Sequence, residues 1–136
     1  MTATTTNGPV LALRAAVLAR LAGDAVLEAL LDAPAIHDEA PVRAGGVHAV
    51  FGDVQCEPDV EGVAVQSLEI VVTGRPGSAA SALMAADRIG GLLDGADLAL
   101  AGPALANLTL VRLTATRDGA TGLARVSLRL RAVTAT

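Results

Sequence analysis

Apolar and polar residues alternate most clearly near the end of the chain, over residues 123–133. Side chains of a strand point alternately to its two faces, so this pattern separates an apolar face from a polar one. The apolar face is formed by Val126, Leu128, Leu130 and Ala132, and the polar face by Arg125, Ser127, Arg129 and Arg131. We expect the first to pack on a core and the second to serve as a docking surface.

Two other segments show the same alternation. Residues 63–73 form the strongest predicted strand. Its apolar face is formed by Leu68, Ile70 and Val72, and its polar face by Ser67, Glu69 and Thr73. Residues 47–56 also alternate, and we expect that strand to bury Val50, Phe51 and Val54.

A hairpin is predicted near the end of the chain. Residues 108–116 and 123–133 are both strand-like, and the connection between them contains Asp118-Gly119, a dipeptide typical of tight turns. A further short strand is expected around residues 98–100, within the loop that precedes this hairpin.

Helical spacing of apolar residues begins after Pro9, which suits a first helical turn, and continues to residue 22. Gly23 ends or kinks this helix, and Asp24 can cap a second, short helical segment over residues 25–31, which Pro34 closes.

A second long helix is predicted from the capping Ser78 to about Leu93. Its inner face is mostly Ala, so it can lie close to a sheet. These elements predict an α+β fold: a mixed, mainly antiparallel sheet of four to five strands with two helices packed against it. We expect residues 1–9 to form a flexible tail and residues 10–136 to form a single domain.

The net charge of −4 conceals an uneven distribution. Residues 1–100 carry five Arg and thirteen acidic residues, whereas residues 101–136 carry five Arg and only Asp118. This polarity suits head-to-tail contact between copies or contact with a charged partner, and it is also compatible with a solvated hairpin.

Catalytic and cofactor-binding motifs are scarce. His48, Asp53 and Cys56 form the one conceivable nucleophile set, and nothing in their spacing orients them as a triad. The spacing of His and Cys predicts no metal site, and the glycine clusters match no phosphate-binding loop. We expect no enzyme activity and no cofactor.

The remaining composition excludes other classes. The apolar stretch over residues 10–31 contains Arg14, Arg20 and Asp24, so we expect no membrane span. A single Cys excludes an internal disulfide. A pI near 5.0 and a single Phe argue against nucleic-acid binding as the main activity.

Several short segments occur in a characteristic order along the chain. They are residues 11–21 followed by Asp24 and Leu27, Ile36-His37-Asp38-Glu39-Ala40-Pro41, Val50-Phe51-Gly52-Asp53, Leu68-Glu69-Ile70-Val71-Val72-Thr73-Gly74, residues 89–93, and Arg129-Leu130-Arg131-Ala132-Val133-Thr134. In this order the chain resembles the tail-terminator, or tail-completion, proteins of tailed phages and gene transfer agents. The family often has an aromatic residue before the Gly-acid pair and a Trp in the second strand, where this chain has Ala49-Val50-Phe51 and Val71-Val72.

The resemblance implies a structural virion protein assembled as a homohexameric ring. Such a ring caps the tail tube, ends tube polymerisation and joins the tail to the head connector, and DNA passes transiently through its centre. The implied partners are further copies of the chain, the major tail tube protein and the connector or stopper protein. The implied location is the head–tail junction of a phage or gene-transfer-agent particle, after assembly in the bacterial cytoplasm.

The charges suggest how copies would meet in a ring. Arg holds carboxylates bidentately, so the polar face of the last strand is a candidate surface for the acidic residues of a neighbouring copy. The candidate interface residues are Arg125, Arg129 and Arg131 on one side and Glu57, Asp59, Glu61 and Glu69 on the other. The acidic loop, solvated in an isolated chain, would in a ring line the bore and repel DNA.

Two other interpretations remain open at this stage. The first is another head–tail component, either a stopper or a tube subunit that polymerises by itself. The second is a small cytosolic enzyme or ligand-binding α+β domain, which would need a polar pocket and no association with tails.

Overall fold

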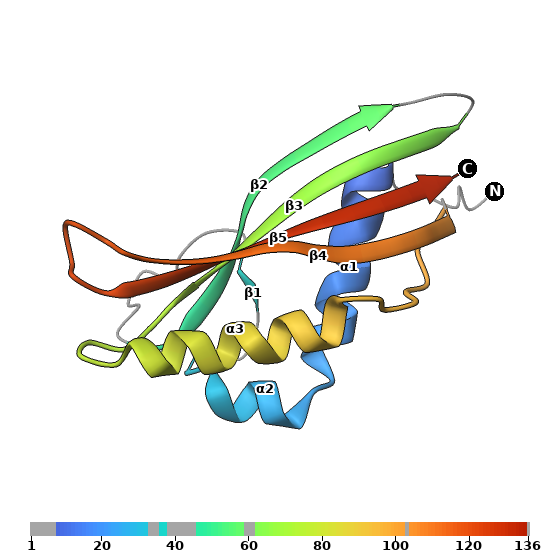
Figure 1. Cartoon of the computed structure of the whole chain (residues 1–136). Helices are drawn as coiled ribbons and strands as arrows, with labels where there is room; N and C mark the ends of the chain where they lie inside the picture. Colours follow the sequence, from blue (N-terminus) through green and yellow to red (C-terminus); the bar gives the residue numbers. More distant parts are fainter. Residues whose placement is uncertain (1–7, 33–35, 38–45, 59–61, 103, 136) are drawn as a thin grey trace.

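The computed structural model describes residues 8–32, 36–37, 46–58, 62–102 and 104–135. Its centre is a five-stranded sheet in the order β1-β2-β3-β5-β4 (Figure 1). The strands are β1 (Ile36–His37), β2 (His48–Pro58), β3 (Val63–Thr73), β4 (Ala104–Arg117) and β5 (Ala124–Ala135). The pair β1–β2 is parallel and the other pairs are antiparallel, which confirms the predicted mixed sheet.

The described helices are α1 (Pro9–Ala22), α2 (Ala25–Leu30) and α3 (Ala79–Leu93), and they lie on one side of the sheet (Figure 1). The sequence predicts two helices packed on the sheet and a short helical segment capped by Asp24, and that segment forms the third helix. Gly23 ends α1, and the Asp24 carboxylate accepts a hydrogen bond from the N–H of Leu27, so α2 starts as a helix of its own. Of the expected tail over residues 1–9, residues 1–7 lie outside the described part, and Pro9 already belongs to α1.

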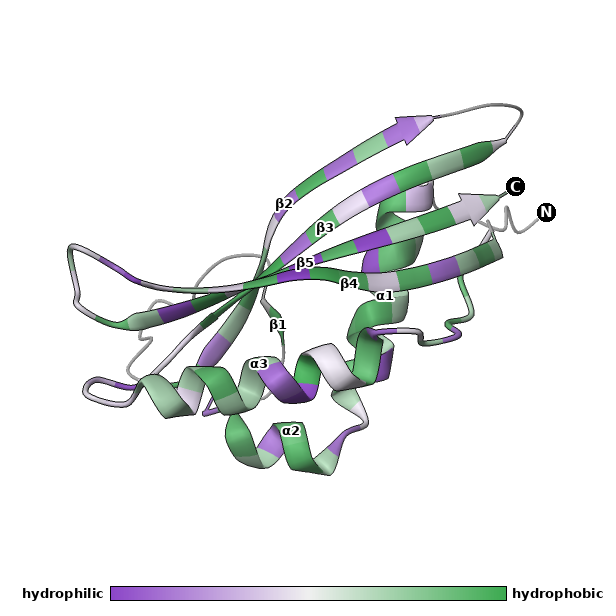
Figure 2. Cartoon of the chain, viewed as in Figure 1, coloured by the Kyte–Doolittle hydropathy of each residue, from purple (hydrophilic) through white to green (hydrophobic). Residues whose placement is uncertain are grey.

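The core lies between the helices and one face of the sheet. On β3 and β5 this face is the predicted one, and its alternation is visible in Figure 2. Its fully buried side chains include Leu68, Ile70, Val72, Val126, Leu128 and Leu130. From the helices, Leu13, Val17, Ile89 and Leu93 pack against them. Burial of these apolar side chains is the main contribution that holds helices and sheet together.

The expected burial of β2 is partly wrong. Phe51 is buried as predicted, but the buried neighbours are Val47 and Ala49, whereas Val50 is half-buried and Val54 is exposed. Val50 pairs with Val71 on the face away from the helices, whereas Phe51 pairs with Ile70 on the core side. A β-bulge adds one residue between Phe51 and Val54, so Val54 pairs with Leu68 on the same side as Phe51. Beyond the bulge the strand also extends past the helices that would cover it.

The predicted hairpin is confirmed and is longer than expected. β4 begins at Ala104 instead of residue 108, whereas residues 98–100 form no strand and Leu98 is buried as part of a loop. At the turn, the Thr121 hydroxyl donates to the Asp118 carboxylate at 2.7 Å, which lowers the pKa of Asp118. The end of the hairpin extends beyond the helices (Figure 1).

Two ion pairs connect the residues that flank α2 with α3 and the loop before it. Arg88 on α3 donates two hydrogen bonds to Asp24, at 2.8 and 2.6 Å, and these lower the pKa of that carboxyl to about 2. Arg75 donates to Asp32 at 2.9 and 3.0 Å and lowers its pKa to about 2 as well. Both arginines bind bidentately, the geometry in which Arg–carboxylate pairs are strongest.

Candidate interaction surface

The face of the sheet opposite the helices carries most of the predicted interface residues. We call this face the open face, because no described helix covers it (Figure 1). By strand register it includes Glu57 on β2, Glu69 on β3, Arg112 on β4, and Arg125, Arg129 and Arg131 on β5. Asp59 and Glu61, also predicted as interface residues, lie outside the described residues.

Glu69 is the centre of a hydrogen-bond network on the open face. Its carboxylate accepts a hydrogen bond from the Ser127 hydroxyl at 2.7 Å and one from the backbone N–H of Asp53 at 3.4 Å. Arg129 lies directly across from it on β5, with Nη2 3.6 Å from Oε2. Two residues predicted to bridge different copies therefore contact each other within one chain.

The bulge in β2 makes room for this carboxylate. Gly52 and Asp53 together lie opposite the single residue Glu69, and a Cβ at position 52 would collide with the Glu69 side chain. Position 52 therefore needs Gly because the Glu69 side chain lies so close to it, and not because its backbone angles are unusual. This gives a physical reason for the glycine in the motif Val50-Phe51-Gly52-Asp53.

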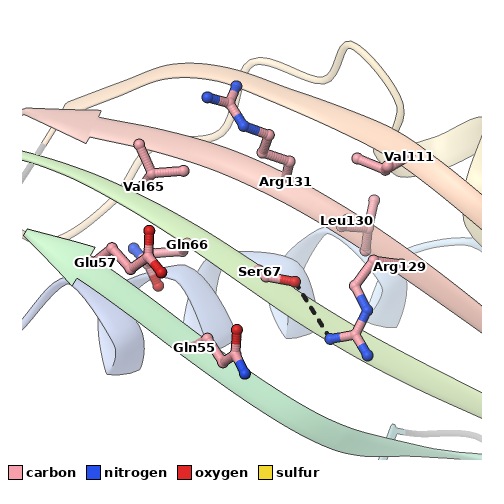
Figure 3. A pocket seen from close by; sticks show the side chains of 9 residues that line it. All are labelled: Gln55, Glu57, Val65, Gln66, Ser67, Val111, Arg129, Leu130 and Arg131. Atoms are coloured by element: carbon pink, nitrogen blue, oxygen red, sulfur yellow. Dashed lines mark hydrogen bonds between the residues drawn. The ribbon is translucent and has the colours of Figure 1, made fainter. Parts of the chain in front are cut away.

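Arg129 is held between two partners. Besides its contact with Glu69, its Nη1 donates a hydrogen bond to the Ser67 hydroxyl at 3.2 Å (Figure 3). Arg131, two residues along the same strand, is exposed and has no hydrogen bond to a described residue. Arg129 and Arg131 therefore differ: the first is paired within the chain, and the second remains available to a partner.

Two shallow hollows mark the open face. One, of about 250 Å³, lies between β2 and β4 and includes Glu57, Ser67 and Arg131 in its lining (Figure 3). The other, of about 440 Å³, is lined by Glu69, Val111, Arg112, Thr114, Ser127 and Arg129. Val111 borders both hollows and is 57% exposed, so an apolar side chain lies among the charges. Such a mixed, shallow surface suits a protein partner better than a small molecule.

Arg112 was not among the predicted interface residues. It lies at a second bulge, where β4 shifts register between Leu110 and Arg112, and it pairs with Arg129 on β5. Its position beside the other arginines depends on the register between β4 and β5, and no local sequence signal reveals this register. With Arg125 and Arg131 it gives the open face three exposed guanidinium groups near β4 and β5.

The conceivable nucleophile set is not assembled. His48, Asp53 and Cys56 lie along β2, and eight residues of strand separate His48 from Cys56 by about 27 Å. His48 is buried, and its Nδ1 lies 3.0 Å from the carbonyl oxygen of Gly46. In the described part of the chain, no group of His, Cys, Asp and Glu side chains could hold a metal ion.

Among the residues described, no helix combines the length and the apolar composition needed to cross a membrane.

The sequence matches the family model "Tail completion protein gp17" over residues 15–135. The chain belongs to this tail-completion family. A chain in the solved structure "Virion of native gene transfer agent (GTA) particle" is 34% identical, with a TM-score of 0.79, covering 93% of this chain and 97% of that chain. No protein of curated function matches the sequence.

Family membership fixes the broad role. This tail-completion protein is a structural, non-enzymatic component of a phage-like virion and is located at the tail. The resemblance read from the order of the sequence motifs is thus confirmed, as is the α+β fold. As a virion component, the protein partners with other tail or head components.

Proposed function

We propose that this tail-completion protein forms a closed homohexameric ring that caps the tail tube, ends its polymerisation and joins the tail to the head connector. The observation that supports it most is the family match over residues 15–135. The partners in this proposal are further copies of the chain, the major tail tube protein and the connector or stopper, at the head–tail junction. Assembly takes place in the bacterial cytoplasm.

The separation of charge across the sheet supports head-to-tail contact. Arg112, Arg125 and Arg131 are exposed on β4 and β5, and Glu57 is exposed on β2, beyond β3. In a heterologous interface one side of each copy meets the other side of the next, so opposite charges at opposite sides attract at every contact. Within a ring, Arg125 and Arg131 would face acidic groups that include Glu57, Asp59 and Glu61.

Glu69 and Arg129 have a different part in this proposal. They neutralise each other within one chain and order the surface around them, because Glu69 also holds Ser127 and the bulge at Asp53. A neighbouring copy would then meet an organised surface, which lowers the entropic cost of association.

The ring would let DNA pass without binding it tightly. The turn between β2 and β3 belongs to an acidic stretch that contains Glu57, Asp59 and Glu61. Acidic side chains of this stretch that are not paired with arginines of a neighbouring copy would line the bore, where their charge repels the phosphate backbone and leaves DNA free to move.

Imaging of particles from cells that lack the gene tests the proposal. Filled heads separated from tails, with tails overlong or ragged at the end that meets the head, would support a tail-terminating ring. Joined particles of normal length would overturn it and favour a small ligand-binding or enzymatic domain. Heads with no tails at all would overturn it in favour of a tube subunit, and tails of normal length on leaking heads would favour a stopper.

A further inference from the structure

The outer edge of β4 is closed along its first half and open along its second. Near the first half, the Gly95 N–H donates to the carbonyl oxygen of Leu108 at 2.8 Å, and the Leu110 N–H donates to the Asp94 carboxylate at 2.9 Å. From residue 111 to 117, the main chain pairs only with β5 among the described residues. All seven of these residues are exposed.

Apart from the bulge at Val111 and two Arg, this open segment lacks the usual protection of an edge strand. Edge strands of monomeric proteins are commonly short or carry Lys, Pro or inward-pointing charges that prevent pairing with another chain. Residues 111–117 contain no Pro, Lys or acidic residue, and they include the apolar Val111 and Leu113, which are 57% and 37% exposed. The segment is therefore suited to accept another strand.

The opposite edge of the sheet has a matching open segment. β1 pairs only with Ala49 and Val50, so residues 52–58 of β2 have β3 as their sole described strand partner. This segment contains two acidic residues, Asp53 and Glu57, and no basic one, whereas residues 111–117 contain two Arg and no acidic residue. The two open edges thus have opposite charge.

We propose that residues 111–117 of β4 pair with residues 52–58 of β2 from a second copy, so that the sheet continues from one subunit to the next. The pairing is antiparallel, because β2 and β4 already run in opposite directions within one sheet. Since the two edges differ, the contact is heterologous and can repeat around a ring. This inference rests on the ring assembly proposed above.

The residue types favour one register. The helix-side residues are Leu113 and Ala115 on β4 and Val54 and Cys56 on β2, so antiparallel pairing with matched faces places Leu113 opposite Cys56 and Ala115 opposite Val54. In this register Val54 and Leu113 are diagonal neighbours on the same face. Their side chains, 38% and 37% exposed in the single chain, would then shield each other from solvent.

On the open face, the same register places Arg112 directly opposite Glu57 of the second copy. Both side chains are exposed in the single chain, and neither has a hydrogen bond to a described residue. Opposite charges that face each other across two strands stabilise the pairing. Thr114 lies opposite Gln55, which adds a polar pair on the same face.

The register also sets how the copies are offset. Within one chain Thr114 is level with Ser127, Val71 and Val50 across the sheet. Pairing it with Gln55 of the next copy moves that copy along the strands by about 15 Å. The strands of successive subunits are therefore staggered, as they are when a twisted sheet closes on itself.

Chemical crosslinking in assembled particles tests the pairing. A chain with Leu113→Cys carries one thiol on each open edge, because Cys56 is already present. In particles from cells that make this variant, a short thiol-to-thiol crosslinker should produce a ladder of linked chains on a denaturing gel. Two controls should give no ladder: Leu113→Cys combined with Cys56→Ser, and Thr114→Cys, whose thiol points to the opposite face.

A charge exchange provides a second measurement that requires no thiol. Arg112→Glu and Glu57→Arg should each lower the yield of transfer-competent particles by about tenfold, and the two together should restore it. If rings or joined particles form but neither ladder nor restoration is seen, the strand pairing is wrong while the ring stands. If gene deletion leaves particles normal, the proposed function itself fails.

Discussion

The Glu69 carboxylate occupies the space that a Cβ on Gly52 would need, so the conformation of the β2 bulge and the position of that carboxylate depend on each other. The bulge supplies the Asp53 N–H as a donor, and β5 supplies the Ser127 hydroxyl. One glycine therefore allows three strands to share a polar network on the open face.

Gly52→Ala should destabilise the protein by about 1–2 kcal/mol, because the Glu69 side chain must move away from donors that it now satisfies. Urea unfolding would measure the loss. Glu69→Ala also destabilises, but Gly52→Ala added to it should cost little, because the colliding side chain is gone. Equal costs of Gly52→Ala in both backgrounds would contradict this coupling.

Two adjacent glycines in α3 should respond oppositely to Ala. A Cβ at Gly91 meets nothing within 4 Å, so Gly91→Ala should stabilise the helix by about 0.5–1 kcal/mol. A Cβ at Gly90 would lie 3.1 Å from a Leu110 methyl and 3.6 Å from a Leu128 methyl, so Gly90→Ala loses this gain or destabilises. Thermal unfolding of the two variants side by side distinguishes them, and identical shifts would argue against close packing of α3 on the sheet.

Asp24→Asn should lower stability at neutral pH and reduce the sensitivity to acid. The Arg88 guanidinium holds the pKa of Asp24 at about 2 in the folded chain, below its ordinary 3.8. The carboxylate therefore stabilises the fold above pH 4, and this contribution is lost as pH falls towards 2. Asn keeps the helix cap but not the charge, so the difference between the two proteins should shrink over that range. A constant difference from pH 7 to pH 2 would contradict the role of the ion pair.

Leu128→Ala should be among the most destabilising single changes, by about 3–5 kcal/mol. Leu128 is fully buried on β5, between the sheet neighbours Ile70 and Leu113 and beneath Gly90 of α3. The exposed Val111→Ala, on the neighbouring strand, should cost well under 1 kcal/mol and serves as the control. Chemical denaturation of the isolated chain measures both, and similar costs would place the core elsewhere.

The sequence predicted β3 and β5 well because each has a single continuous face against the core. Alternation fails where the covering or the register changes: Val50 lies on the open face opposite Val71, the bulge at Gly52 places Val54 on the helix side opposite Leu68, and Val54 is still exposed because the helices do not reach that part of β2. Arg112 was missed for the same reason, since its place beside Arg129 depends on strand pairing and a second bulge. Long-range register of this kind leaves no local trace in the order of residues.

The helices cover only part of the sheet, and this divides the molecule into regions of different local stability. Backbone amides beneath the helices should exchange with solvent only when the whole chain unfolds, whereas those near residues 52–58 and 111–117 can open locally. If these segments pair between copies as proposed above, a change in one of them would leave the fold intact and block one edge of the sheet. Such a chain would still join a growing assembly through its other edge, and adding it would slow completion in proportion to its concentration.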